Sequence, residues 1–304
     1  MKTPPKKPQP QKIPITLNPY TKPAKPPEDL LAHLEDRGLL VQDRAAALST
    51  LRSVGYYRLL IYMRALQSQP SKAFAHGTSF ENVVALYNFD RELRLLCLDA
   101  IERIEVALRA SIINSLSLPH GPHFYLDPRH FETTESFRGF FGKAAHAEYL
   151  AISHYHKHYN SPPHAPIWAI CEAVTFGGLS HLFSGLSLAN RKLVAKLFGF
   201  DEGVLVSWFR TLNDLRNMCA HHNRLWNAHL IVNKPMSAKA VSSELRTTQD
   251  RFYSRVILIV ALLKKIDQTS DWRQRFFDLL SRYPNVQVVE MGFPSDWKSR
   301  SFWS

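Results

Sequence analysis

One segment in the middle of the chain restricts the fold more than any other. From Phe80 to Leu116 the sequence has neither glycine nor proline and is rich in leucine and alanine, which favours a helix over strands and turns. Ser79 is a good N-cap directly before this segment, and the pattern leaves open an interruption near residues 89–90. Glycine is scarce throughout, with 12 among 304 residues. We therefore expect a mostly α-helical fold.

The sequence pattern divides the chain into four parts. Residues 1–27 hold nine prolines, six lysines and no acid. This composition predicts a disordered basic arm, either a plain solvated tail or an arm that lies on RNA phosphates. An N-terminal helical segment is expected over 28–78, and a larger helical domain over 79–267 with a connecting insertion at about 119–165. A C-terminal helix and an irregular tail packed by its aromatic side chains are expected over 268–304.

Within these parts the apolar periodicity predicts individual helices. Besides the long segment, they are expected at about 27–38, 43–54, 138–153, 166–176, 179–187, 190–198, 203–227, 244–266 and 271–282.

The charge balance is strongly basic, with 38 Lys and Arg against 26 Asp and Glu and a formal net charge of +12. Such an excess favours a polyanionic partner, most simply RNA or DNA. An anionic membrane surface is the rival partner. It is disfavoured because the sequence has no apolar run of about 18 residues and no signal-peptide pattern at its start.

The three cysteines, Cys97, Cys171 and Cys219, include no CxxC pair. A sparse, odd set of this kind is typical of a protein in a reducing cytoplasm and argues against a zinc framework. His154 and His158 stand four residues apart, a spacing that can ligate zinc, but no HExxH motif accompanies them. The sequence also has no glycine-rich phosphate loop, so we expect no metal and no other cofactor.

The segment VSWFRTLNDLRNMCAHHNRLWN, residues 206–227, carries residue types suited to phosphate chemistry. Treated as one helix with 100° per residue, it has two stripes. The apolar stripe contains Leu212, Leu215, Cys219, His222 and Trp226. The polar stripe contains Asn213, Asn217, His221 and Arg224, and it is flanked by Arg216.

The two adjacent histidines of this segment are predicted to differ. His222 is expected to face the core or an interface, whereas His221 shares its stripe with amides and an arginine. Arginine offers paired donors to phosphate oxygens, and histidine exchanges protons near neutral pH. The spacing alone leaves two interpretations open: a phosphodiester site, or a histidine-rich helix with structural hydrogen bonds.

A resemblance to a known family is carried by the same residues. RNMCAH, from Arg216 to His221, resembles the R-x4-6-H signature of HEPN ribonucleases, and LRNMCAHHNRLWN is similar to the core motif of AbiD and AbiF proteins. Further similar pieces follow the family's order: LEDRGL (34–39), LRSVGYYRL (51–59), FENVVALYNFDRELRLLCLDAIERIEVALR (80–109), PPHAPIWAICEAVTFGGLSHLF (162–183) and MGFPSDW (291–297). Over roughly residues 28–300 the chain resembles the Abi-like (AbiD/AbiF) family of the HEPN superfamily.

The resemblance implies a fold and an activity. The domain at 79–267 would be a HEPN-type helical bundle, and two copies in a homodimer would bring two arginines and two histidines into one composite site. That site would cut RNA without a metal by attack of the 2′-hydroxyl on the adjacent phosphate, leaving a 2′,3′-cyclic phosphate. Arg216 would hold the phosphate, His221 would act as general base or acid, and Asn217 would orient one of them. His222 also fits the permitted spacing.

The implied biological role is an RNA-cutting effector of abortive infection or of a toxin–antitoxin system in bacterial antiphage defence. Two other interpretations remain open. One is a non-catalytic RNA-binding HEPN module that partners a small RNA or a protein, and the other is an assembly protein whose aromatic and histidine-rich faces only mediate contacts.

Several weaker candidates have structural alternatives. The pairs Asp99/Arg103 and Glu105/Arg109 have the i,i+4 spacing of surface salt bridges. Glu172 lies in an otherwise apolar helix and should be paired, either structurally or as an orienting partner of the 206–227 helix. Arg224 is a further supporting candidate for the site.

An RNA-binding surface could also use basic residues outside the 206–227 segment. The candidates are Arg58, Arg91, Arg94 and Arg103. Tyr56 and Tyr57 could stack on bases beside Arg58, or could be core residues at a helix junction.

Overall fold

The computed structural model describes residues 19–303 except 22, 146–148 and 246–248. All regular elements in these residues are helical, with twelve α-helices and six short 3-10 helices, so the mostly α-helical class is confirmed. The predicted arm at 1–27 lies largely outside the described residues. The chain forms two compact units, residues 1–80 and 81–304, which are described separately.

The first unit is built from three short helices with apolar inner faces. These are α1 (Pro27–Glu35), α2 (Arg44–Ser53) and α3 (Tyr56–Met63), followed by the 3-10 turn η1 (Arg64–Leu66). The helix starts follow local chemistry: the Asp43 side chain accepts a hydrogen bond from the Ala46 backbone N–H at 2.9 Å and so caps α2. Gly38, with φ 87°, follows α1 as the sequence predicted. The buried core of the unit includes Leu31, Leu34, Leu51, Leu59, Tyr62 and Met63.

The second unit is organised around α4 (Phe80–His120), a helix of 41 residues. It runs through residues 89–90 without the interruption that the pattern left open. The remaining α-helices of the unit are α5 (Thr134–Ala145), α6 (Leu150–His158), α7 (Ile167–Ala173), α8 (Phe176–Gly185), α9 (Leu188–Ala195), α10 (Glu202–Ala220), α11 (Phe252–Ile266) and α12 (Trp272–Arg282). Short 3-10 turns complete it: η2 (Phe124–Leu126), η3 (Pro128–His130), η4 (Lys239–Val241), η5 (Val288–Met291) and η6 (Trp297–Ser299).

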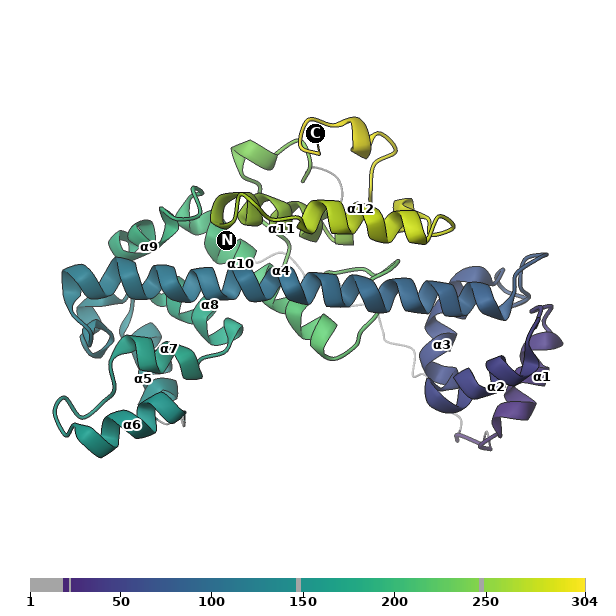
Figure 1. The fold of residues 1–304 in the computed structure, drawn as a ribbon, viewed down its shortest axis with the longest axis horizontal. Helices are drawn as coiled ribbons and strands as arrows, with labels where there is room; N and C mark the ends of the chain where they lie inside the picture. The colour runs from purple at the N-terminus through teal and green to yellow at the C-terminus, as the bar shows by residue number, and fades with distance from the viewer. Residues whose placement is uncertain (1–18, 22, 146–148, 246–248, 304) are drawn as a thin grey trace, which may run out of the picture. The chain divides into compact units, whose positions relative to one another are not determined.

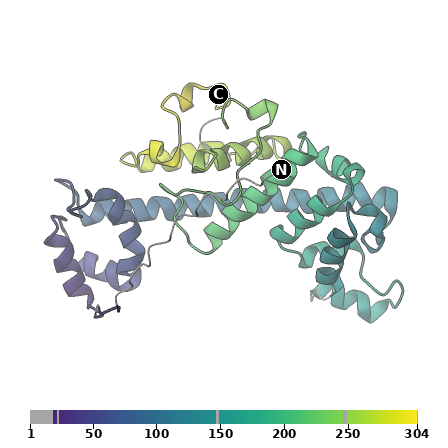
Figure 2. The same ribbon diagram turned by 180° about the vertical axis from the view of Figure 1, so that it is seen from behind.

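The helices of this unit gather on different sides of α4. Helices α11 and α12 run along one side of it, and α5 to α8 cluster on another side near its C-terminal end (Figure 1 and Figure 2). The Trp272 indole of α12 donates to the Leu96 backbone oxygen of α4 at 2.7 Å, both deep in the core. The predicted tail is confirmed as aromatic packing, because Phe293, Trp297 and Trp303 are all buried there.

Residues 119–165 are more ordered than the sequence indicated. Instead of one short helix at 138–153, the structure has two helices, α5 and α6. Edge-to-face contacts of Phe131 with Phe137 and of Tyr125 with Phe140 pack the first of them. The predicted limits were wrong here, although Phe137, Phe140 and Phe141 have the i,i+3,i+4 spacing of a helical face.

Two predicted helix limits are also wrong. Helix α10 ends at Ala220 rather than at residue 227, and α11 begins at Phe252 rather than at residue 244. The Glu244 carboxylate, in the segment before α11, is buried. It accepts a hydrogen bond from the Tyr253 hydroxyl and forms an ion pair with Arg300. Tertiary partners of this kind override the local helical propensity.

A buried carboxylate on α4 fixes the segment that follows α10. Asp90 accepts the backbone N–H of Trp226 at 2.7 Å and that of Leu225 at 3.0 Å. The Arg94 guanidinium donates to the same carboxylate at 2.5 Å and to the Asn223 backbone oxygen at 3.4 Å. Arg94 was predicted on an RNA-binding surface, and that prediction is wrong because its side chain is almost fully buried in this ion pair.

We predict that Asp90→Asn destabilises the protein strongly. It leaves the Arg94 charge buried without a counter-charge, a change that typically costs about 3–5 kcal/mol. The matched control is Asp99→Asn on the same helix, whose pairs with Arg103 and Arg275 are partly exposed and should contribute at most about 1 kcal/mol each. Urea unfolding of both variants measures the difference, and equal losses would contradict the assignment.

Candidate functional site

Helix α10 is held in place by its apolar face. The buried residues on it include Leu205, Trp208, Phe209, Leu212, Leu215 and Cys219. This face contacts α8, α9 and α11, and Cys219 hydrogen-bonds Cys97 of α4. Burial, followed by that contact, raises the pKa of the Cys97 thiol. The predicted apolar stripe is therefore confirmed for Leu212, Leu215 and Cys219.

The other face of α10 presents the candidate site residues. Asn217 and His221 are exposed, and Arg216 is partly buried. The Arg216 Nη1 atom lies 3.5 Å from Asn217 Oδ1, so the amide oxygen faces the guanidinium. The Asn213 side chain instead packs against α8 at Gly177. The two are so close that a Cβ atom at Gly177 would lie only 3.1 Å from the Asn213 amide oxygen.

The Glu105 carboxyl of α4 lies close enough to Arg216 for the two charges to interact. Burial raises the pKa of the Glu105 carboxyl, while the nearby charges of Arg109 and then Arg216 oppose that rise. Arg109 pairs with Glu105 at 3.2 Å and donates to the Cys171 backbone oxygen at 2.9 Å. The predicted i,i+4 pair Glu105/Arg109 is thus confirmed, and Arg216 lies in a field of mixed charge.

Glu172 has the ionic partner that its apolar surroundings predicted. Its carboxylate lies 4.0 Å from Arg109 Nη1. This ion pair joins α7 to α4 rather than to α10, and 47% of the Glu172 side chain is exposed. The contact supports a structural role for Glu172.

The two histidines at the end of α10 terminate the helix. His221 is the C-cap, and His222 follows with φ 58°. The His222 N–H donates to the Cys219 oxygen at 3.0 Å, and the Asn223 N–H donates to the Met218 oxygen at 2.8 Å. These two bonds form a Schellman motif, whose left-handed position usually holds glycine, although histidine is one of the side chains that adopt it more readily than most.

His222 is therefore not a core residue. Of the two predicted positions, core or interface, the core is wrong, and the interface stays a prediction. His222 is exposed, because the chain leaves the helix axis at this point. Arg224 lies in the following loop and donates to the Asn227 backbone oxygen at 3.1 Å. Arg224 consequently does not lie on the polar stripe of α10. The prediction that placed it there assumed a continuous helix to residue 227.

The other predicted RNA-contacting arginines belong to helices other than α10. Arg91 is exposed on α4. Arg103 pairs at 3.3 Å with both Asp99 and Asp267, which confirms the predicted i,i+4 pair. Arg58 belongs to α3 in the first unit.

A buried arginine that the sequence interpretation missed holds the loop after α10. Arg255 of α11 donates to the backbone oxygens of Leu230 at 2.6 Å and Asn233 at 2.8 Å, and burial lowers its pKa to about 10. The signal in the sequence is a single charge inside the apolar run FYSRVILIV. Together with Asp90, this arginine fixes the path of the backbone after His221.

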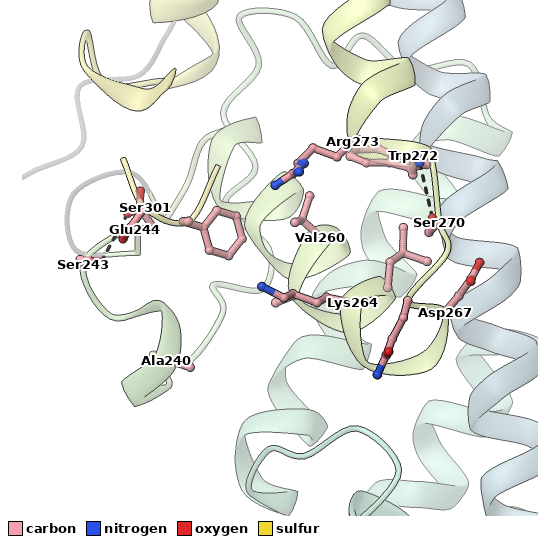
Figure 3. Close-up of a pocket in the computed structure, with 14 residues that line it drawn as sticks. Ala240, Ser243, Glu244, Val260, Lys264, Asp267, Ser270, Trp272, Arg273 and Ser301 are labelled. Atoms are coloured by element: carbon pink, nitrogen blue, oxygen red, sulfur yellow. Dashed lines mark hydrogen bonds between the residues drawn. The ribbon is translucent and has the colours of Figure 1, made fainter. Parts of the chain in front are cut away.

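No cluster of three or more His, Cys, Asp or Glu side chains suited to a metal ion occurs among the described residues. The rings of His154 and His158 do lie close, with centroids 4.2 Å apart. A separate cavity of about 480 Å³ lies between α11, the start of α12 and the C-terminal tail. Figure 3 shows Lys264, Arg273 and Trp272 around it. Its described lining contains none of the α10 site residues.

Comparison with known proteins gives one match. A family model described as Abi-like protein matches residues 49–227, more than half of the chain, and the match includes α4, α10 and the Arg216–His221 run. No curated protein and no solved structure matches the chain. In the part of the chain that the structure describes, no helix has the length and apolar character needed to cross a membrane.

We predict that His222→Gly leaves the protein at least as stable as the parent, whereas His222→Val destabilises it. The left-handed conformation costs a non-glycine residue about 1–2 kcal/mol, and a β-branched side chain tolerates it worst. His221, with φ −87°, needs no glycine, so His221→Gly is the control and should lower stability slightly. Thermal unfolding ranks the variants, and a His222→Gly protein as unstable as His222→Val would refute the helix-terminating role.

Proposed function

Because this chain belongs to the Abi-like protein family, which is named for abortive infection, a bacterial defence against phage, we propose that it acts in that defence as a metal-independent endoribonuclease. The observation that carries the proposal is the end of α10. There Arg216, Asn217 and His221 stand on a helix whose opposite face is buried and whose last turn is closed by the Schellman motif. Side chains on such a rigid element keep the orientation that catalysis requires.

The proposed reaction is a transesterification within the RNA. His221 takes the proton of a 2′-hydroxyl, and the 2′-oxygen attacks the adjacent phosphorus. The bond from phosphorus to the 5′-oxygen breaks, and that oxygen takes up a proton. The products are a 2′,3′-cyclic phosphate and a 5′-hydroxyl, with no metal ion in any step.

Arg216 is assigned to the phosphate. Its planar guanidinium provides two parallel donors to phosphate oxygens, and its contact with Asn217 restrains it. Charge that develops on the phosphate during attack is stabilised by such fixed donors. Glu105 and Arg109 of α4 hold the surroundings of this arginine in place.

The helix geometry supports a site made from two copies of the chain. Arg216 and His221 are five positions apart, which is about 7.5 Å along the helix axis and roughly 140° around it. One copy thus points the two groups in different directions, and a second copy would supply the complementary pair. An active protein that sediments as a monomer would contradict this part of the proposal.

We predict that His221→Ala abolishes RNA cleavage in the presence of EDTA while the protein stays folded. Loss of a general acid or base typically lowers the rate about 100- to 10,000-fold. The matched control is His222→Gly, which keeps the helix end and should cut at close to the parent rate. Cleavage that disappears on chelation, or that survives in His221→Ala, would refute the proposed mechanism.

We predict that Arg216→Ala loses about 100- to 1,000-fold in single-turnover rate, the usual effect of removing a donor to developing charge. Its RNA affinity should stay within a few-fold of the parent, because many other basic residues share the non-specific phosphate attraction. Arg216→Lys should rescue poorly, since an ammonium group cannot reproduce the planar donors. Arg210→Ala, an exposed arginine on the same helix, is the control.

The opposite result for Arg216 would support the rival function. If Arg216→Ala lost affinity while bound RNA was cut at an unchanged rate, the arginine would only bind. If the parent bound RNA and never cut it, the chain would be a non-catalytic RNA-binding module.

A further inference from the structure

The first unit carries a groove whose lining is basic. It has a volume of about 1,090 Å³ and runs between the segment before α1, helix α1 itself, helix α3 and the loop after η1. Five basic side chains line it, and no acidic side chain occurs in its described lining. The basic side chains are Lys25, His33, Arg37, Arg64 and Lys72.

Three acids of this unit have partners outside the groove. Glu28 pairs with Arg52 and Glu35 pairs with Arg44, and Asp43 caps α2. The Glu28 and Glu35 pairs neutralise arginines outside the groove. The charge of Asp36 acts on His33, but the four Lys and Arg side chains of the lining outnumber it. A groove of this kind attracts an anionic ligand.

The basic groups in the groove also lie close to one another. Burial, followed by the positive charges of Arg37 and Lys25, lowers the pKa of His33. Such mutual repulsion is costly without a ligand and is relieved when phosphate groups lie between the charges.

The groove volume also reaches the upper end of the roughly 300–1,000 Å³ typical of small-molecule pockets. A groove of this size suits a polymer better than a single small anion.

Exposed tyrosines add a second chemical feature to the same groove. Tyr20 is 78% exposed and Tyr57 is 74% exposed, and the two hydroxyl groups hydrogen-bond each other. The Tyr56 ring meets Tyr57 edge to face at 5.5 Å between centroids. Tyr57 is therefore not a core residue, and its ring is available for stacking.

We propose that this groove binds single-stranded RNA, with Tyr57 and Tyr20 stacking on bases and Arg37 and Arg64 contacting phosphates. Positively charged grooves with aromatic platforms bind single strands, because every base offers a flat face for stacking. In an intact duplex the bases already stack on one another, and recognition relies on shape and on the backbone instead. That the ligand is RNA rests on the proposed function. The chemistry of the groove indicates that this RNA is unpaired, which gives the substrate class.

The described lining of the groove contains none of Arg216, Asn217 and His221, so substitutions in it leave the proposed chemical groups unchanged. Substitutions in it should weaken the capture of unpaired RNA and leave the cleavage rate of saturating RNA within about twofold. The His221→Ala variant is the right background for binding measurements, because it is expected to leave the RNA intact.

The test measures affinity for a short fluorescent oligouridine by anisotropy over a range of salt concentrations. Tyr57→Ala should bind about tenfold more weakly, in line with the loss of one stacked base, whereas Tyr57→Phe should stay within about twofold. The double substitution Arg37→Ala with Arg64→Ala should reduce the slope of log affinity against log salt by about 1.4, or about 0.7 for each phosphate contact. The corresponding double lysine variant should keep most of that slope, and Arg210→Ala is the control outside the groove.

Several results would overturn the proposal. The first is that the groove variants bind oligouridine as well as the parent does, and the second is that they lose duplex RNA binding to the same extent. The third is that the parent prefers oligothymidine to oligouridine, and the fourth is that the variants lose only binding to phosphatidylserine vesicles. The phenylalanine and lysine variants keep the test decisive if an alanine variant fails to fold.

The two proposals can fail separately. If the parent protein binds oligouridine through the groove but never cuts RNA, only the proposed function is refuted. Normal binding by groove variants of a protein whose cleavage requires His221 would refute only this inference.

Discussion

The buried carboxylate of Asp90 is the contact on which the geometry of the second unit depends. It satisfies two backbone N–H groups of Leu225 and Trp226 and neutralises Arg94, all out of reach of water. A buried charge is stable only when it is paired and fully hydrogen-bonded, so α4 and the segment after α10 are fixed together. The position of the helix end therefore depends on a residue more than a hundred positions earlier in the chain.

This constraint gives the adjacent histidines their different roles. Because the chain must turn to reach Asp90, α10 ends at Ala220 and His222 takes the left-handed position of the Schellman motif. His221 remains at the helix end, exposed, on the last turn after Arg216. In the proposed mechanism the first histidine exchanges protons with the RNA, and the second shapes the helix end. Arg255 completes the support by holding the backbone of the following loop.

The sequence predicted those features that are encoded locally. The absence of glycine and proline predicted nearly all of α4, and i,i+4 spacing predicted the pairs Asp99/Arg103 and Glu105/Arg109, since both depend only on near neighbours. The end of α10 was missed because a histidine occupies the position where glycine normally marks a helix end. Arg94 was misassigned although it has the same i,i+4 spacing to Asp90, because this spacing does not show that the pair is buried or that Asp90 also binds backbone groups of a distant segment.

The chemical nature of the RNA ends tests the central claim most directly, namely that the end of α10 promotes attack by a 2′-hydroxyl. RNA cut by the purified protein in EDTA should carry 2′,3′-cyclic phosphate and 5′-hydroxyl ends. A substrate with 2′-deoxy sugars at the cleaved positions should stay intact, because the attacking group is missing. Products with 3′-hydroxyl and 5′-phosphate ends would contradict the account, since water rather than the 2′-oxygen would then have attacked the phosphorus.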